Sequence, residues 1–273
     1  MSSVPFAPPL DPAPLPYRRP FATGRTILAL MIREMTTTYG RSPGGYIWAI
    51  LQPIGAIAIM AFAFSLALRT PPLGTDFIYF YASGYLIFHA YQDISGKTAS
   101  AMRYSRALLA YPAVTYFDAI FARFLLAAIT HAVVIVIVLA GIIWIDDLAV
   151  ILRPGYLVEG FVLACLLGLG IGTLNCLLSG LFPVWERVWA VLNRPMMLIS
   201  GVFFTFQNLD SQAQAWLWFN PLIHVIGLFR AGMFVIYDPS YVSYTYVLAI
   251  SLVTLVAGLV FLNRYQREII NGR

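Results

Sequence analysis

Charged residues are scarce in this sequence: they make up 11% of its 273 residues, whereas 60% are hydrophobic. Soluble proteins carry about 25% charged residues, so the composition excludes an ordinary soluble domain. Lysine is almost absent, with Lys97 the single example, and the net charge of +5 therefore comes from arginine. The arginines are spread along the chain and form no single basic patch, which argues against nucleic-acid binding.

Cysteine is also rare, and its two positions predict no disulfide. Cys165 and Cys176 are eleven residues apart on one expected helix, which separates them by about 16 Å along its axis. That distance is too great for a disulfide. We interpret both residues as small buried apolar groups.

The sequence lacks a complete nucleotide-binding loop. Gly96-Lys97-Thr98 resembles the end of a phosphate loop, but Tyr91 stands where the loop requires its first glycine. The preceding segment is also an expected membrane helix, whereas a phosphate loop follows a strand. We therefore expect that the chain does not itself bind ATP.

No catalytic or metal site is predicted. The three histidines, His89, His131 and His224, are interpreted as isolated from one another, whereas a haem or metal site needs facing ligands. No serine or aspartate belongs to a recognisable set of nucleophile, base and orienting group. An intramembrane enzyme or a structural membrane subunit, with groups assembled from distant spans, remains the alternative class.

Hydrophobic segments predict an all-α membrane protein with six transmembrane helices. The segments lie at about 46–68, 77–94, 116–144, 156–182, 194–206 and 244–262. The first is about 35 Å long as a helix, enough to cross a ~30 Å hydrocarbon core, while the fifth is short for a full crossing. Residues 1–20 contain seven prolines and predict a disordered cytoplasmic tail.

Arginine distribution predicts that both termini are cytoplasmic. With the segments near 95–112 and 183–194 on the same side, that side collects every basic residue except Arg69, Arg153 and Arg230. Cytoplasmic loops carry such an excess of positive charge. The same rule keeps residues 207–240 on the outer side, so we expect short re-entrant helices there between the fifth and sixth spans.

An amphipathic helix is predicted at about 22–39, before the first span. Ile27, Met31, Met35 and Tyr39 recur every four residues, with arginines on the other side. Such a helix lies in the membrane surface. Proline and paired glycines within 40–45 then end it. On pattern alone, this segment could also be a simple linker.

Small residues follow one face of the fourth predicted span. They recur every four residues, as Ala164, Gly168, Gly172, Cys176 and Gly180. Small residues let helix backbones approach closely. We expect packing within the chain or across a dimer seam, with Asn175 bonded to a neighbouring helix.

Two separated sequence blocks carry a resemblance to a known family. The first block consists of Arg33-Glu34, Tyr39-Gly40 and the run Gly45-Tyr-Ile-Trp-Ala-Ile-Leu-Gln-Pro53. The second block consists of Trp218-Phe-Asn-Pro-Leu-Ile-His-Val225 and Arg230. In this order they resemble the ABC type-2 exporter permeases, and most closely the KpsM-type branch that exports capsular polysaccharide. The order of spans is similar along roughly residues 25–265.

The resemblance implies a transport subunit that is not an enzyme. Such permeases work as a homodimer with two copies of a separate ATPase, which binds ATP and Mg. They export lipid-linked polysaccharide across the bacterial inner membrane, beside periplasmic and outer-membrane capsule proteins. Export of another glycan, such as O-antigen or teichoic acid, or of a small drug, is the alternative within transport.

We expect two sets of functional residues. The stretch Gly96–Ala110 is predicted to be a coupling helix docked on the ATPase. The proposed coupling residues are Arg33, Glu34, Ser100, Arg103 and Arg106. Aromatic faces suit sugar rings, and Arg123 lies at the cytoplasmic mouth of its span. The proposed substrate path is therefore Tyr81, Tyr85, Phe88, Arg123, Phe204 and Trp216, although aromatics also gather at membrane interfaces as simple packing groups.

Overall fold

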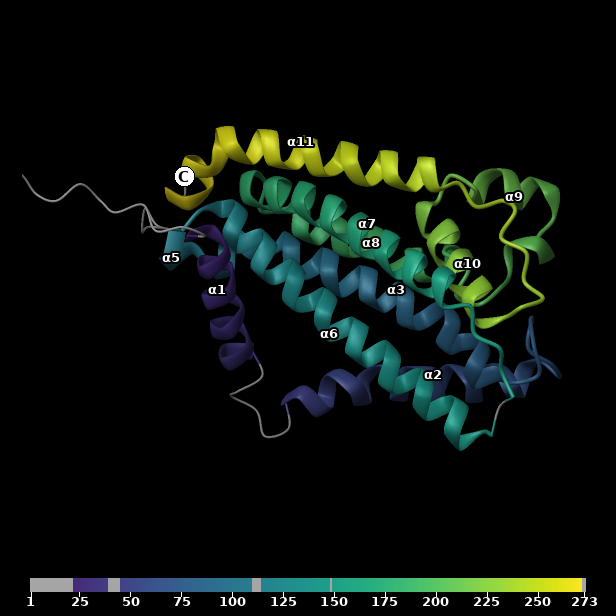
Figure 1. Cartoon of the computed structure of the whole chain (residues 1–273). Helices are drawn as coiled ribbons and strands as arrows, with labels where there is room; N and C mark the ends of the chain where they lie inside the picture. The colour runs from purple at the N-terminus through teal and green to yellow at the C-terminus, as the bar shows by residue number, and fades with distance from the viewer. Residues whose placement is uncertain (1–21, 39–44, 110–113, 148, 272–273) are drawn as a thin grey trace, which may run out of the picture.

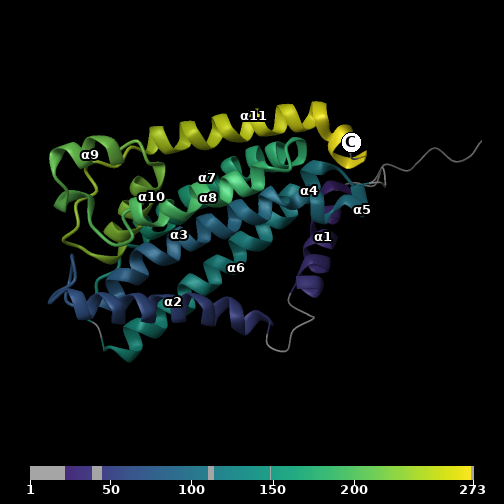
Figure 2. The same ribbon diagram turned by 180° about the vertical axis from the view of Figure 1, so that it is seen from behind.

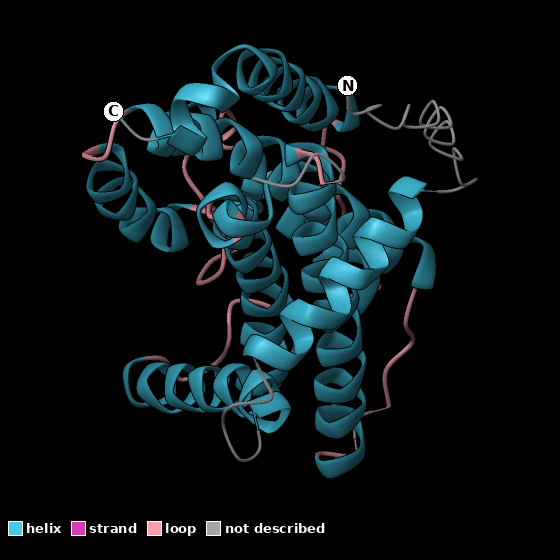
Figure 3. Cartoon of the chain, turned by 90° about the vertical axis from the view of Figure 1, so that its left-hand side faces the viewer, coloured by secondary structure: helices cyan, strands magenta, loops and turns pink. Residues whose placement is uncertain are grey.

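The computed structural model describes residues 22–38, 45–109, 114–147 and 149–271, and within these ranges it is helical without strands (Figure 3). The helices are α1 (Ala22–Thr38), α2 (Gly45–Ala67), α3 (Phe77–Ala99), α4 (Ala101–Tyr104), α5 (Arg106–Leu109), α6 (Tyr116–Ile145), α7 (Pro154–Leu181), α8 (Trp185–Ile199), the 3-10 helix η1 (Phe206–Asn208), α9 (Ser211–Leu217), α10 (Pro221–Met233) and α11 (Tyr244–Asn271). The predicted all-α class is confirmed.

Four helices in the described ranges are long and apolar enough to cross a membrane. They are α2, over Ile47–Leu66, together with α6, α7 and α11. Helix α3 is as long as α2, at 23 residues, but it carries Asp93 and Lys97 and is largely buried among its neighbours. Six crossings therefore stay a prediction, although every predicted long span is a helix.

The fifth predicted span differs from the structure. It was expected at 194–206, but helix α8 runs from Trp185 to Ile199 and has only 15 residues. Gly201 follows with a φ of +85°, a left-handed conformation that commonly ends a helix just beyond its last turn. Glu186 lies in the first turn of this helix, where a carboxylate is favourable near the positive end of the helix dipole.

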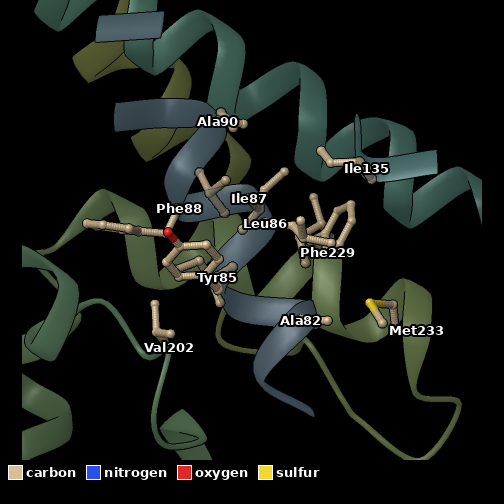
Figure 4. Packing of buried hydrophobic residues seen from close by; sticks show 14 of the residues in the cluster. Ala82, Tyr85, Leu86, Ile87, Phe88, Ala90, Ile135, Val202, Phe229 and Met233 are labelled. Carbon is tan, nitrogen blue, oxygen red and sulfur yellow. The ribbon is translucent and has the colours of Figure 1, made fainter. Parts of the chain in front are cut away.

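Helix α3 lies in the middle of the molecule, between α6, α7 and α10 (Figures 1 and 2). Its start is capped by Asp76, whose carboxylate accepts a hydrogen bond from the Tyr79 backbone at 2.7 Å. The close view shows its side chains packed against Ile135 of α6 and Phe229 of α10 (Figure 4). The buried core is thus arranged around this helix.

The small residues of α7 allow α3 to approach its backbone closely. A Cβ added at Gly172 would lie 2.7 Å from the Ser95 carbonyl oxygen, and one at Gly168 would lie 2.9 Å from the Ile94 side chain. Packing within the chain, predicted from the sequence, is confirmed. Asn175 also behaves as predicted, since its Oδ1 accepts a hydrogen bond from Trp185 Nε1 of α8 at 2.8 Å.

Two ends of the helix bundle can be distinguished in Figure 1. Helices α1, α4 and α5 and the end of α11 form one end, which we call the α4–α5 end. The turn after α2, the loop before α7 and helices α9 and α10 form the other, the α9–α10 end. The structure thus brings α4, α5 and the end of α11 together at one end, and the arginine distribution predicted that these segments share one side.

The α9–α10 end contains the short helices expected within 207–240. Asn220 caps α10 by accepting from the Leu222 backbone at 3.0 Å, and its amide donates to the Ile199 carbonyl at 3.0 Å. His224 Nε2 lies 2.8 Å from the Trp218 carbonyl oxygen. Short helices between α8 and α11 are present as predicted, and their depth in the membrane stays a prediction.

Candidate functional site

Helix α1 packs on α6 at the α4–α5 end (Figure 1). Leu28, Ile32 and Met35 are exposed on its outer side, while Leu30 is buried. The predicted apolar stripe is only partly reproduced: Met35 is exposed, Ile27 and Met31 are half-buried, and Tyr39 lies outside the described residues. The exposed apolar side fits a helix that lies in a membrane surface.

Arg123 of α6 connects three parts of this end. Its Nη2 lies 2.9 Å from the Glu34 carboxylate of α1, and its Nη1 donates to Ser100 Oγ at 3.1 Å. Its guanidinium also lies 4.2 Å from the centre of the Tyr104 ring of α4, a favourable cation–π distance. The structure thus brings together Arg123 and two predicted coupling residues, Glu34 and Ser100, although they were predicted for different roles.

A line of polar side chains on α3 continues from this point. His89, Asp93 and Lys97 are spaced by four residues, so they share one face of the helix. The Asp93 carboxylate lies 2.8 Å from Lys97 Nζ and 2.9 Å from His131 Nε2 of α6. Asp93 is half-buried, and such partners stabilise its ionised carboxylate there.

The prediction that the histidines are isolated is wrong for two of them. The rings of His89 and His131 are centred 5.2 Å apart on neighbouring helices. His89 Nε2 also lies 3.3 Å from Gln52 Nε2 of α2. Within the ranges that the structure describes, no group of three histidine, cysteine, aspartate or glutamate residues is arranged to hold a metal ion. We therefore interpret this cluster as a hydrogen-bonded polar network.

These polar side chains surround a pocket of about 460 Å³, which we call the Arg123 pocket. Its lining residues are His89, Gln92, Asp93, Gly96, Lys97, Ser100, Tyr104 and Arg123. Polar and ionisable groups inside a membrane protein are costly and mark functional paths or sites. The Arg123 pocket is therefore the candidate site.

The predicted coupling stretch consists of three pieces. Helix α3 extends to Ala99, beyond the predicted end near 94, and the one-turn helices α4 and α5 follow; Ala110 lies outside the described residues. Arg103 forms an ion pair with Glu186 of α8, and Arg106 Nε donates to the Ile270 carbonyl at 2.8 Å. A smaller pocket of about 240 Å³ lies between these residues. Arg33 is exposed on α1.

The proposed aromatic path is not a continuous open surface in this arrangement of the chain. All three aromatic residues of α3, Tyr81, Tyr85 and Phe88, are buried, and Figure 4 shows the last two within the core. Phe204 is half-buried, and Trp216 is 80% exposed on α9. Tyr81 packs against Phe64 of α2, with ring centres 5.2 Å apart. A role in the substrate path stays a prediction for all of them.

Comparison with known protein sequences identifies the family of this chain. The sequence profile of the ABC-2 type transporters matches residues 25–234. The chain belongs to the ABC-2 type transporter family. Among the relatives of this ABC-2 chain is the capsule polysaccharide export inner-membrane protein CtrC of Neisseria meningitidis serogroup A, 30% identical over 90% of this chain and 92% of the relative. The polysialic acid transport protein KpsM of Escherichia coli is 31% identical over 86% of this chain and 91% of the relative. The capsule polysaccharide export inner-membrane protein BexB of Haemophilus influenzae is 28% identical over 90% of this chain and 93% of the relative.

The two sequence blocks that resemble ABC-2 permeases occupy identifiable structural positions. Glu34 from the first block is bonded to Arg123, while Asn220, His224 and Arg230 from the second block fix α10 to its surroundings. Sequence reasoning missed the polar network on α3 of this ABC-2 chain. The four-residue spacing of His89, Asp93 and Lys97 was a usable signal, but its partner His131 could be found only from the packing of α6 on α3.

Proposed function

We propose that this chain is the permease subunit of an ATP-driven exporter that moves lipid-linked capsular polysaccharide across a bacterial inner membrane. The observation that carries the proposal is the similarity to proteins named for capsule polysaccharide export, over about nine-tenths of both lengths. The polar network of the Arg123 pocket supports it, because hydrophilic groups within a membrane bundle suit the passage of a polar solute.

In this proposal the chain crosses the membrane six times, with both termini in the cytoplasm. The spans are α2, α3, α6, α7, α8 and α11. The grouping of α1, α4, α5 and the end of α11 at one end supports this topology (Figure 2). The arginine excess at that end supports its assignment to the cytoplasmic side.

The functional complex contains a second copy of this chain and two copies of a separate ATPase, which holds ATP and Mg. Helices α4 and α5 supply the ATPase contact, helped by Arg33 on α1. Exposed side chains at Arg103, Tyr104 and Arg106 support this role. Periplasmic and outer-membrane capsule proteins receive the polymer.

The polymer enters beside Arg123 and passes the aromatic residues of α3, from Phe88 and Tyr85 towards Tyr81. Because those rings are packed in the present arrangement, transport requires α2 or the 200–205 segment to move away from α3. Phe204 and Trp216 then lie on the outer part of the path.

Deletion of this chain from its host tests the function. We expect lipid-linked polysaccharide to disappear from the cell surface and accumulate inside, and the native chain to restore export. A matched strain with the partner ATPase inactivated should show the same internal polymer. Unchanged surface polysaccharide with altered drug sensitivity would instead support a drug exporter.

A further inference from the structure

The guanidinium of Arg123 is enclosed but incompletely bonded. The residue is 7% exposed and lines the Arg123 pocket. Its Nη atoms bond to Glu34 and Ser100, whereas its buried Nε has no hydrogen-bond partner among the residues that the structure describes. Arginine presents five N–H donors in a planar fork that matches phosphate and carboxylate oxygens. Arg123, which lines the pocket, therefore keeps one N–H donor that no described residue satisfies.

The net charge around the Arg123 guanidinium depends on whether the Glu34 carboxylate is bonded to it. Asp93 lies between Lys97 and His131, so its carboxylate is already shared. Glu34 supplies the carboxylate bonded to Arg123, and it comes from a separate element, helix α1. With Glu34 in place, two carboxylates face the two permanent cations Arg123 and Lys97. If α1 moved and withdrew Glu34, the pocket would become cationic and would attract one negative charge.

The position of the pocket indicates where that negative charge comes from. Helix α1, which supplies Glu34, exposes Leu28 and Ile32 on its outer side, at 56% and 54%. An amphipathic helix of this kind lies at the boundary between headgroups and acyl chains. The Arg123 pocket beside it is therefore at the depth of lipid phosphates.

We propose that the Arg123 pocket binds the phosphodiester headgroup of an anionic membrane lipid, and that this phosphodiester replaces the Glu34 carboxylate on Arg123. A phosphodiester carries one negative charge, so it restores the balance that Glu34 provides. Its oxygens accept from the guanidinium fork, while Lys97 contributes a second cation. Lipid binding then releases Glu34, and with it the ion pair between α1 and α6. The binding test does not use the polymer, so its outcome is separate from that of the proposed export function.

Native mass spectrometry of the purified full-length chain tests this binding, with added phosphatidylglycerol, phosphatidylcholine or inorganic phosphate. We expect phosphatidylglycerol to bind more tightly than phosphatidylcholine. Arg123→Gln should weaken that binding roughly tenfold or more, because a charge-assisted hydrogen bond is lost. Glu34→Gln should tighten it, because the competing carboxylate is gone. That gain keeps the test informative if Arg123→Gln folds poorly.

Two exposed residues on α11, at the same end of the molecule, provide matched controls. Arg264→Gln removes one positive charge and Glu268→Gln one negative charge without touching the pocket. Both should bind phosphatidylglycerol like the native chain. Equal binding of the two lipids, no gain with Glu34→Gln, or equal effects of Arg264→Gln and Arg123→Gln would overturn the proposal. Displacement of the lipid by millimolar inorganic phosphate would overturn the lipid assignment in favour of free phosphate.

Discussion

Arg230 Nε donates a hydrogen bond to Ser83 Oγ at 3.1 Å, across 147 positions of the sequence. The same guanidinium donates from Nη1 to the Phe204 carbonyl at 2.9 Å and lies 4.4 Å from the centre of the Phe80 ring. One buried cation thus joins α10, α3 and the segment after α8. Arg230, one of the three arginines that the charge count placed on the outer side, is thus a structural centre of the α9–α10 end.

Replacing Arg230 with leucine should destabilise the chain by about 3 kcal/mol or more, since hydrogen bonds to charged groups contribute about 1.5–3 kcal/mol each. Thermal unfolding of the purified protein in detergent measures the change. Arg230→Lys should lose less stability, because lysine keeps the positive charge. It should still lose some, because lysine cannot reproduce the planar fork of donors. A leucine variant as stable as the native chain would show that these contacts are dispensable.

The close contact between α7 and α3 predicts that alanine substitutions at two glycines change the stability of the protein by different amounts. Gly172→Ala places a methyl group 2.7 Å from the Ser95 carbonyl oxygen, so we expect a loss of about 1–3 kcal/mol from overpacking. Gly141→Ala in α6 meets nothing within 4 Å and should be neutral or slightly stabilising. Unfolding measurements on both variants compare them, and equal stabilities would contradict the close packing.

The proposed ATPase contact predicts which positions of α4 and α5 crosslink to the partner. Tyr104 is 63% exposed, whereas Ser105 is 7% exposed. Cysteine at Tyr104 should therefore crosslink to the ATPase, and cysteine at Ser105 should not. The native Cys165 and Cys176 are buried and should give little background. Crosslinking is scored on gels of membranes that contain both subunits, and failure at Tyr104, Arg103 and Ala107 together would exclude this surface.

Sequence periodicity was sufficient to predict most helices of this bundle, because long apolar runs and the breaks at proline and glycine act locally. The bounds of α8 were missed, because its first turns carry Glu186 and Arg187, and such charges are typical of a loop between spans. The His89–His131 proximity depends on which faces of α3 and α6 meet, and no local pattern fixes that. Asp118 forms a capping box with Thr115 at the start of α6.

Tyr81 offers a way to separate packing from transport. Its hydroxyl is buried without a hydrogen-bond partner in the described part of the chain, and an unsatisfied buried group costs about 1–3 kcal/mol. Tyr81→Phe should therefore keep or slightly raise thermal stability. If the hydroxyl contacts sugars during export, the same variant should lower surface polysaccharide in the host. Normal export with normal stability would leave Tyr81 as a packing residue.

Transport in inverted inner-membrane vesicles tests the export function most directly. With the chain and its ATPase both present, ATP should move lipid-linked polysaccharide from the outer face of these vesicles into their interior, where added glycosidase cannot degrade it. Vesicles with the ATPase but without this chain should protect no polymer. Equal protection in both, or protection that does not depend on ATP, would contradict the account.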